Sequence, residues 1–110
     1  MPKYLIQTHI TQEGIKGTVK EGGTARKEAI TKAMEAMGGK VEALYYAFGQ
    51  TDLFIIVDLP DNATAAAAGM VGEAPGTSEL SITVLITPEE VDQAAQMAQK
   101  MSASYRAPGR

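Results

Sequence analysis

The sequence predicts an α+β domain, in which helices cover one face of a four-stranded antiparallel sheet and a further helix follows near the C-terminus. Four segments alternate apolar and polar residues and are rich in strand formers, at 3–10, 40–48, 52–59 and 78–86. Helix signals fill two of the intervals between them. The short connection between the second and third strands favours an antiparallel hairpin. We expect one domain over residues 1–101 and an extended tail at 102–110.

The first strand, 3–10, has two distinct faces because side chains alternate along a strand. One face carries Tyr4, Ile6, Thr8 and Ile10, and the other carries Lys3, Leu5, Gln7 and His9. Thr11 can cap a helix directly afterwards. Gly14 and Gly17 each weaken that helix by about 1 kcal/mol relative to alanine, so we expect a short helix that ends at Gly22–Gly23.

The segment 24–39 predicts a stronger helix, with Thr24 as its N-cap and good helix formers inside it. Its apolar side is formed by Ala29, Ile30, Ala33, Met34 and Met37. Gly38–Gly39 supplies a left-handed stop. A third helix is expected to begin at Asp61 or Asn62, to be broken by Gly72 and to close at Pro75–Gly76.

The last helix, 87–101, has the clearest start signal, because Thr87 can cap it, Pro88 suits its first position and Glu90 completes a capping box. The order of elements is strand, helix, strand, strand, helix, strand, followed by this extra helix. That order matches the ferredoxin-like βαββαβ plan, in which the first and third strands are central.

The third strand is apolar on both faces, since Phe54 and Ile56 lie opposite the face formed by Leu53, Ile55, Val57 and Leu59. A sheet with one face in water shows a cleaner alternation. The face without helices is therefore expected to be covered. We favour a second copy of the chain, in a dimer or higher oligomer, over the C-terminal helix or tail of the same chain.

Composition excludes several classes of function. The 110 residues carry a net charge of -3, which disfavours nucleic-acid binding. Without cysteine and with a single histidine, the chain has no thiol chemistry and no His-rich metal site, and we expect neither a metal nor a cofactor. No segment has the roughly 20 apolar residues of a membrane span, and the N-terminus lacks signal-peptide features. We expect a cytoplasmic protein that does not bind membranes.

Candidate catalytic residues are His9, Asp52 and Tyr45. His9 suits acid–base chemistry near neutral pH, but a partly exposed strand histidine explains it equally simply and is favoured. Asp52 could be a carboxylate at the mouth of a cavity, with Tyr45 or Tyr46 supplying a phenol. Alternatively it binds loop amides in the hairpin turn, as Asp often does, and this is the favoured interpretation.

Candidate ligand-binding residues are Lys20, Gly22, Gly23 and Arg26, in the stretch KEGGTAR (20–26). Cationic side chains and free amides before a helix could hold a carboxylate or phosphate. The stretch lacks the Gly-Lys-Ser/Thr ending of a P-loop. The favoured alternative is a kink between two helices, with Arg26 paired to Glu28, Glu21 or a neighbouring chain.

Three stretches carry a resemblance to a known family: LIQTHITQEGIKGTVKEGGTARKEAI (5–30), MGGKVEALYYAFGQTD (37–52) and IVDLPDNATAAA (56–67). They resemble the GYD-domain proteins, which are small bacterial proteins named for a Gly-Tyr-Asp signature. Here Thr51 stands where that signature has tyrosine, and Gln50 separates it from Gly49. The resemblance implies a ferredoxin-like fold akin to the dimeric α/β-barrel proteins, and it implies no settled activity.

Two functions from different classes follow. The first is a small oligomeric protein that binds a small-molecule ligand or has a structural or regulatory role. The second is a cofactor-free enzyme acting on a small organic molecule in a sheet-lined pocket. The missing nucleophile, metal cluster and strong acid–base pair favour the first.

Overall fold

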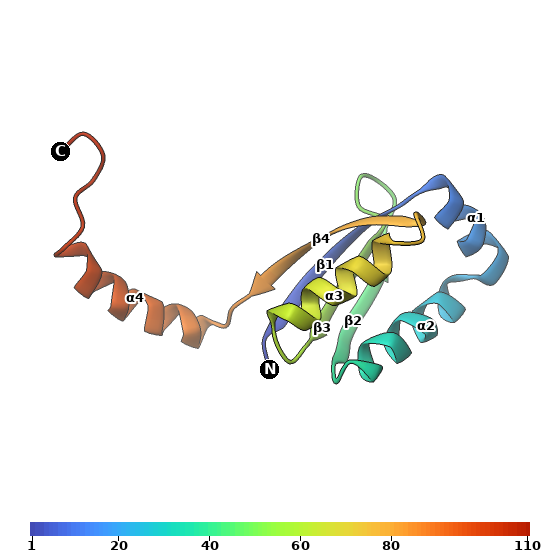
Figure 1. Cartoon of the computed structure of the whole chain (residues 1–110), viewed down its shortest axis with the longest axis horizontal. Coiled ribbons are helices and arrows are strands. Elements are labelled where there is room, and N and C mark those ends of the chain that lie inside the picture. Colours follow the sequence, from blue (N-terminus) through green and yellow to red (C-terminus); the bar gives the residue numbers. More distant parts are fainter.

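A computed structural model describes all residues, 1–110, as an α+β fold built on one antiparallel sheet (Figure 1). The elements are β1 (Lys3–Ile10), α1 (Gln12–Glu21), α2 (Gly23–Ala36), β2 (Lys40–Tyr46), β3 (Leu53–Asp58), α3 (Asn62–Glu73), β4 (Ser78–Leu85) and α4 (Pro88–Ser102). The sheet order is β2-β3-β1-β4, so β1 and β3 are central as expected. This arrangement is compatible with the ferredoxin-like plan, with two consecutive helices between β1 and β2.

The core lies between the sheet and the helices α2 and α3. Register places Tyr4, Ile6 and Thr8 of β1 opposite Val57, Ile55 and Leu53 of β3, and all six are buried. Met34 of α2 and Ala65 and Ala68 of α3 close over this layer. The hydroxyl of Tyr4 donates a 2.6 Å hydrogen bond to Oδ1 of Asn62, which anchors the start of α3 to the sheet.

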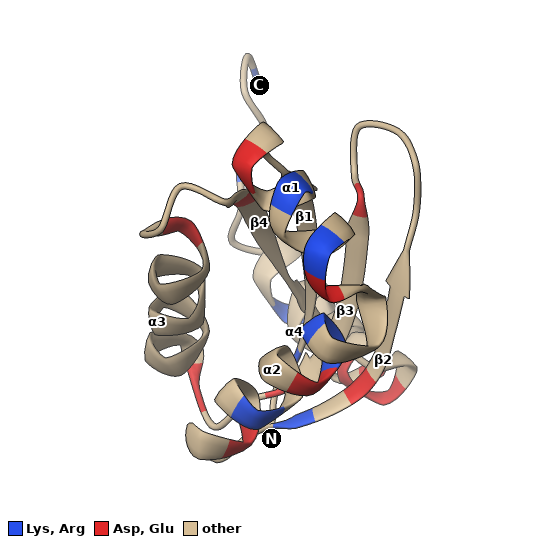
Figure 2. Cartoon of the chain, turned by 90° about the vertical axis from the view of Figure 1, so that its right-hand side faces the viewer, with Lys and Arg blue, Asp and Glu red and all other residues tan.

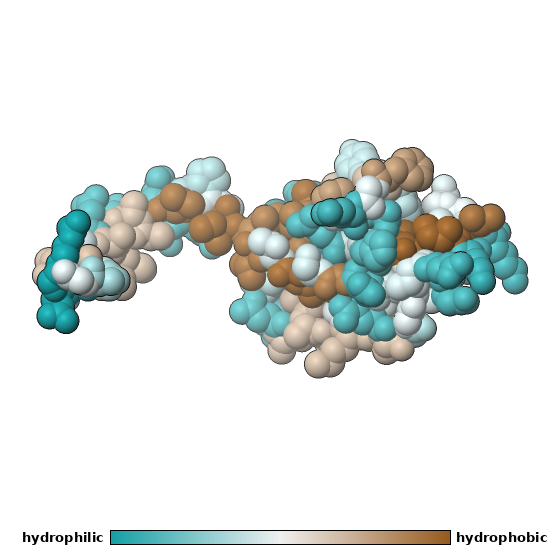
Figure 3. Space-filling model, turned by 90° about the horizontal axis from the view of Figure 1, so that it is seen from above, coloured by the Kyte–Doolittle hydropathy of each residue, from teal (hydrophilic) through white to brown (hydrophobic).

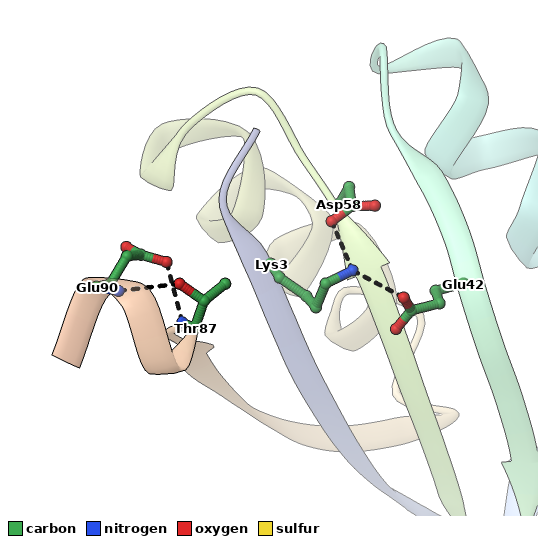
Figure 4. A network of polar contacts seen from close by, with 5 residues as sticks. All are labelled: Lys3, Glu42, Asp58, Thr87 and Glu90. Atoms are coloured by element: carbon green, nitrogen blue, oxygen red, sulfur yellow. Dashed lines mark hydrogen bonds and ion pairs between the residues drawn. The ribbon is translucent and has the colours of Figure 1, made fainter. Parts of the chain in front are cut away.

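Most of the predicted helix starts are confirmed. Thr11, Asp61 and Thr87 each cap a helix with a side-chain oxygen, and Thr87 and Glu90 form the full capping box (Figure 4). The prediction that Thr24 is an N-cap is wrong, because α2 starts one residue earlier. Gly22, with a φ of 85°, is its N-cap, and this left-handed conformation turns the chain sharply between α1 and α2.

The predicted break at Gly72 is also wrong, since α3 continues to Glu73. A Cβ at Gly72 would lie 2.8 Å from Cδ2 of Leu80. The glycine therefore lets the helix approach β4 closely, and this packing outweighs its low helix propensity.

The second face of the sheet has no helix over it. We call this whole face the open face. Its apolar centre consists of Leu5, Ala43, Tyr45, Phe54 and Ile56. At one end of this face Nζ of Lys3 bridges two carboxylates, with Oδ1 of Asp58 at 2.9 Å and Oε1 of Glu42 at 3.1 Å (Figure 4). Three strands, β1, β3 and β2, are tied together by this bridge.

The helix α4 projects away from the rest of the chain, in line with β4 (Figure 1). Every residue from Pro88 to Ser102 is exposed. The longest dimension of the molecule, 58 Å, includes this arm, whereas the other two dimensions are 32 and 22 Å. The alternative in which α4 folds over the open face of its own chain is not what the structure shows.

Candidate functional site

A pocket of about 460 Å³ lies on the helix-covered side of the sheet. Figure 2 shows α3 beside the strands and apart from α2, and residues of both helices line the pocket together with residues of the strands. Its floor comes from the strands and includes Ile6, Thr8, Leu53 and Ile55, while α2 contributes Ile30, Ala33 and Met34. Ligand pockets commonly measure roughly 300–1,000 Å³ and are mostly apolar, so this one has the size and character to hold a small organic molecule.

Three polar side chains of the pocket lie where α1, α2 and β2 meet. Arg26, Glu21 and Tyr46 all line the pocket there. Nη1 of Arg26 lies 3.6 Å from Oε2 of Glu21, and both side chains are about half exposed. Because a guanidinium has five N–H donors, this single ion pair leaves Arg26 able to bind a further acceptor.

Burial raises the pKa of the Tyr46 phenol above its ordinary value of 10.0, and the positive charge of Arg26 partly opposes that rise. Tyr46 is therefore a neutral hydrogen-bond donor throughout the physiological pH range. The guanidinium of the neighbouring Arg26 can also only donate hydrogen bonds. This end of the pocket thus suits a ligand group that accepts hydrogen bonds, such as a carboxylate, enolate or carbonyl oxygen.

Two glycines of α1 line the pocket but have different surroundings. A Cβ at Gly14 would overlap the carbonyl oxygen of Thr77, so that position holds α1 tightly against the loop before β4. A Cβ at Gly17 would meet nothing within 4 Å. Packing thus explains Gly14, whereas Gly17 leaves space open beside the pocket.

The predicted catalytic residues do not lie in this pocket. His9 and Asp52 contact each other, with Nδ1 of His9 3.1 Å from Oδ2 of Asp52. The same Oδ2 accepts a 2.8 Å hydrogen bond from the backbone amide of Ile10. His9 alternates with the buried Thr8, so it belongs to the face of the sheet opposite the pocket.

Tyr45 lies opposite Phe54 on the open face and is 72% exposed. The open face therefore carries His9 and Tyr45, whereas Arg26 lines the pocket on the other side of the sheet. His9, Tyr45, Asp52 and Arg26 therefore do not converge on one cavity.

The predicted ligand-binding stretch is divided in the same way. Arg26 lines the pocket, but Lys20, Gly22 and Gly23 do not. Gly22 turns the chain, and Gly23 faces the ring of Tyr46, which a Cβ there would approach to 3.5 Å. Sequence reasoning named Arg26 but did not place Tyr46 in the same pocket, since the two residues lie on different elements and share no local motif.

The structure contains no group of three or more His, Asp or Glu side chains that could hold a metal ion. None of its helices combines the length and the apolar character that crossing a membrane requires.

Comparison with known proteins places the chain in a family. The family model described as GYD domain matches residues 4–95, which include the first three helices, the start of α4 and the sheet except for Lys3. The chain belongs to the GYD-domain family. No curated protein and no solved structure matches it. Within this GYD-domain protein, the Oγ1 of Thr51 lies 3.5 Å from Oε1 of Gln7 beside the hairpin.

Proposed function

We propose that this GYD-domain protein binds a small, largely apolar molecule that carries one anionic or hydrogen-bond-accepting group. The observation that carries the proposal is the 460 Å³ pocket between the helices and the sheet, apolar along most of its wall and lined by Arg26 and Tyr46 at one end. The apolar body of the ligand would contact Ile30, Met34 and Ile55. Its acceptor group would meet the guanidinium of Arg26 and the phenol of Tyr46.

The lining residues favour binding over chemistry. Thr8 is the only buried polar residue of the chain, and the pocket contains no histidine, no cysteine and no pair of carboxylates in contact. The two carboxylates that line it, Glu13 and Glu21, are paired with Lys16 and Arg26. Neither is a free general base positioned against the ligand. The pocket supplies shape, an apolar wall and the donors Arg26 and Tyr46, which suit a binding site.

A matched pair of probes tests this proposal by calorimetric titration of the full chain. 2-Naphthoate has the apolar body and the carboxylate, and 2-naphthamide is its neutral counterpart. Arg26→Met should weaken naphthoate binding by about tenfold, or about 1.4 kcal/mol, and weaken naphthamide binding less, because only the carboxylate loses a charged hydrogen bond. Lys27→Met is the control, because it removes the neighbouring charge from α2 at a position outside the pocket.

A second pair of variants tests the place of binding. Ala33→Leu adds volume to the pocket wall and should abolish binding of both probes, whereas Ala66→Leu, at an exposed position of α3 outside the pocket, should not. Binding that survives Ala33→Leu, or no binding of either probe to the unaltered chain, would contradict the proposal.

A second candidate function is supported by the contact between His9 and Asp52. The carboxylate orients the imidazole and leaves Nε2 free to accept a proton, as a general base requires. Hydrolysis of p-nitrophenyl acetate is a suitable probe. His9→Gln and Asp52→Asn should both slow it if the pair acts as a unit. A rate that depends on His9 but not on Asp52 would indicate only an exposed histidine.

A further inference from the structure

The helix α4 is amphipathic but has no partner within its own chain. Its apolar stripe consists of Val91, Ala94, Ala95, Ala98 and Met101, at the three- and four-residue spacing of one helix face. The opposite side carries Glu89, Gln93, Gln96 and Lys100. Val91 is 49% and Met101 is 69% exposed. Figure 3 shows hydrophobic atoms at the junction of the domain with the arm and onward along it.

A helix in this position needs a surface to pack against. Isolated helices shorter than about 12–15 residues are marginal in water, and most helical stability comes from burying an apolar face. The capping box of Thr87 and Glu90 fixes where α4 begins, but it stabilises only the first turn. The stripe therefore indicates that α4 is buried against something outside its own domain.

The connection to β4 sets where α4 can reach. Only Ile86 and Thr87 separate β4 from α4, and Thr87 is extended, with a φ of -80° and a ψ of 160°. Pro88 favours that extended conformation in the residue before it. The arm is thus directed beyond the end of its own sheet, where a neighbouring molecule can receive it.

We propose that α4 is an exchanged arm, which packs its apolar stripe on the open face of a second copy of the chain. The open face is the complementary surface: Leu5, Phe54 and Ile56 form an apolar centre without any helix above it. The lengths also agree. A helix of this size is about 22 Å long, and a four-stranded sheet is about 19 Å wide, so α4 can cross the whole sheet.

Reciprocal exchange supports a second copy rather than another protein. Because each α4 crosses the open face of the other copy, the two sheets do not face each other directly. A helix about 22 Å long and about 10 Å in diameter covers about 220 Å² of a sheet, so one contact buries about 440 Å² on the two surfaces together. A two-fold axis repeats the contact and brings the total to about 900 Å², close to the lower limit of about 1,200 Å² for specific interfaces. A different partner that used one of these contacts alone would bury only half of that area.

Cross-linking tests the proposed contact directly, because the chain has no cysteine. Ala98→Cys, in the middle of the stripe, and Phe54→Cys, on the open face, are made in separate chains, which are mixed and oxidised. A disulfide-linked dimer is expected from this mixture. The control replaces Ala98→Cys by Gln96→Cys, on the opposite side of α4, and should give no such dimer.

A third mixture shows whether the arm enters the ligand pocket instead. Ala98→Cys is mixed with Ala33→Cys, whose position lines the pocket. Cross-linking of this pair in place of the Phe54→Cys pair would overturn the proposal, and so would equal cross-linking of the Gln96→Cys control. These outcomes are independent of naphthoate binding and therefore of the proposed function.

Assembly is measured by light scattering on the full-length chain. Unaltered protein should have the mass of a dimer or a higher oligomer, and Val91→Asp combined with Met101→Asp should reduce that mass to the monomer value. Gln93→Asp combined with Gln96→Asp adds the same charge to the polar side and should leave the oligomer intact. A monomeric unaltered chain, or an oligomer that tolerates the charged stripe, would overturn the proposal.

Discussion

Oδ2 of Asp52 lies 3.1 Å from Nδ1 of His9 and 2.8 Å from the backbone nitrogen of Ile10. The backbone of Asp52 also bonds in both directions: its N–H donates to the carbonyl of Thr8, and its carbonyl accepts from the N–H of Ala47, each at 2.8 Å. Asp52 therefore closes the hairpin loop and ties it to β1. Its carboxylate also bonds the loop to β1 at the amide of Ile10. A residue that only closed the turn would bond within the loop.

Removing this carboxylate should destabilise the fold. Asp52→Ala leaves the Ile10 amide without its acceptor, and we expect the free energy of unfolding to fall by about 1–3 kcal/mol. His9→Ala should cost less than about 1 kcal/mol, because the His9 side chain is 54% exposed and exposed ion pairs contribute little. Urea unfolding of both variants gives the comparison, and equal losses would contradict the role assigned to the Ile10 amide.

Two glycines in the same helix should respond oppositely to alanine. Gly17→Ala should raise the free energy of unfolding by up to about 1 kcal/mol, since its Cβ meets open space and alanine favours the helix. Gly14→Ala should lower it by about 1–3 kcal/mol, because the added methyl group overlaps the Thr77 carbonyl. Thermal and urea unfolding measure both changes. A stabilising Gly14→Ala would show that α1 is not held closely against that loop.

Removing the N-cap of α4 should destabilise the start of that helix and leave the sheet unaffected. Thr87→Ala removes the hydroxyl that accepts the Glu90 amide at 3.0 Å, and cap removal costs about 0.5–2 kcal/mol. Because no residue of α4 is buried within its own chain, we expect faster hydrogen exchange in the first turn of α4 and little change in the sheet amides. Thr87→Ser retains a hydroxyl and is the control. Faster exchange throughout the sheet would contradict local action.

The sequence was sufficient to predict the strands, most helix starts and the central place of β1 and β3. Alternation along β1 and β3 correctly separates the buried face from the open face, because side chains alternate by geometry. Thr11, Asp61 and Thr87 are local cap signals, and local signals need no tertiary information. The failures at Thr24 and Gly72 both depend on tertiary structure. The chain turns at Gly22, which becomes the N-cap of α2, and close packing of α3 on Leu80 outweighs the low helix propensity of Gly72.

The pocket could not be predicted in the same way. Its lining is assembled from residues as distant along the chain as Thr8, Arg26 and Leu80, and no local pattern reports that α2 and α3 leave space between them. The stretch KEGGTAR drew attention to Arg26, which lines the pocket, because free amides before a helix and a nearby cation can bind an anion. That Tyr46 rather than Tyr45 accompanies it depends on the register of β2 with β3 and on the bulge between Val41 and Ala43.

Alkaline titration should distinguish Tyr46 from an exposed tyrosine. Its pKa is raised above 10.0 by burial, so the folded state holds the phenol proton more tightly than the unfolded state does. The corresponding stability is fully present below pH 10 and is lost as the pH rises through the folded pKa. Absorbance of tyrosinate should show a late ionisation step above pH 10, and Tyr46→Phe should remove that step.

The same alkaline titration also reports on Arg26, whose charge opposes the rise in the pKa of Tyr46. Arg26→Met should therefore move the late ionisation step to still higher pH, whereas Lys27→Met should leave it in place. Naphthoate bound at Arg26 should shift the step in the same direction as Arg26→Met, because its carboxylate neutralises the guanidinium and places a negative charge beside the phenol. No shift on saturation with naphthoate would place the carboxylate elsewhere in the pocket, away from the two donors.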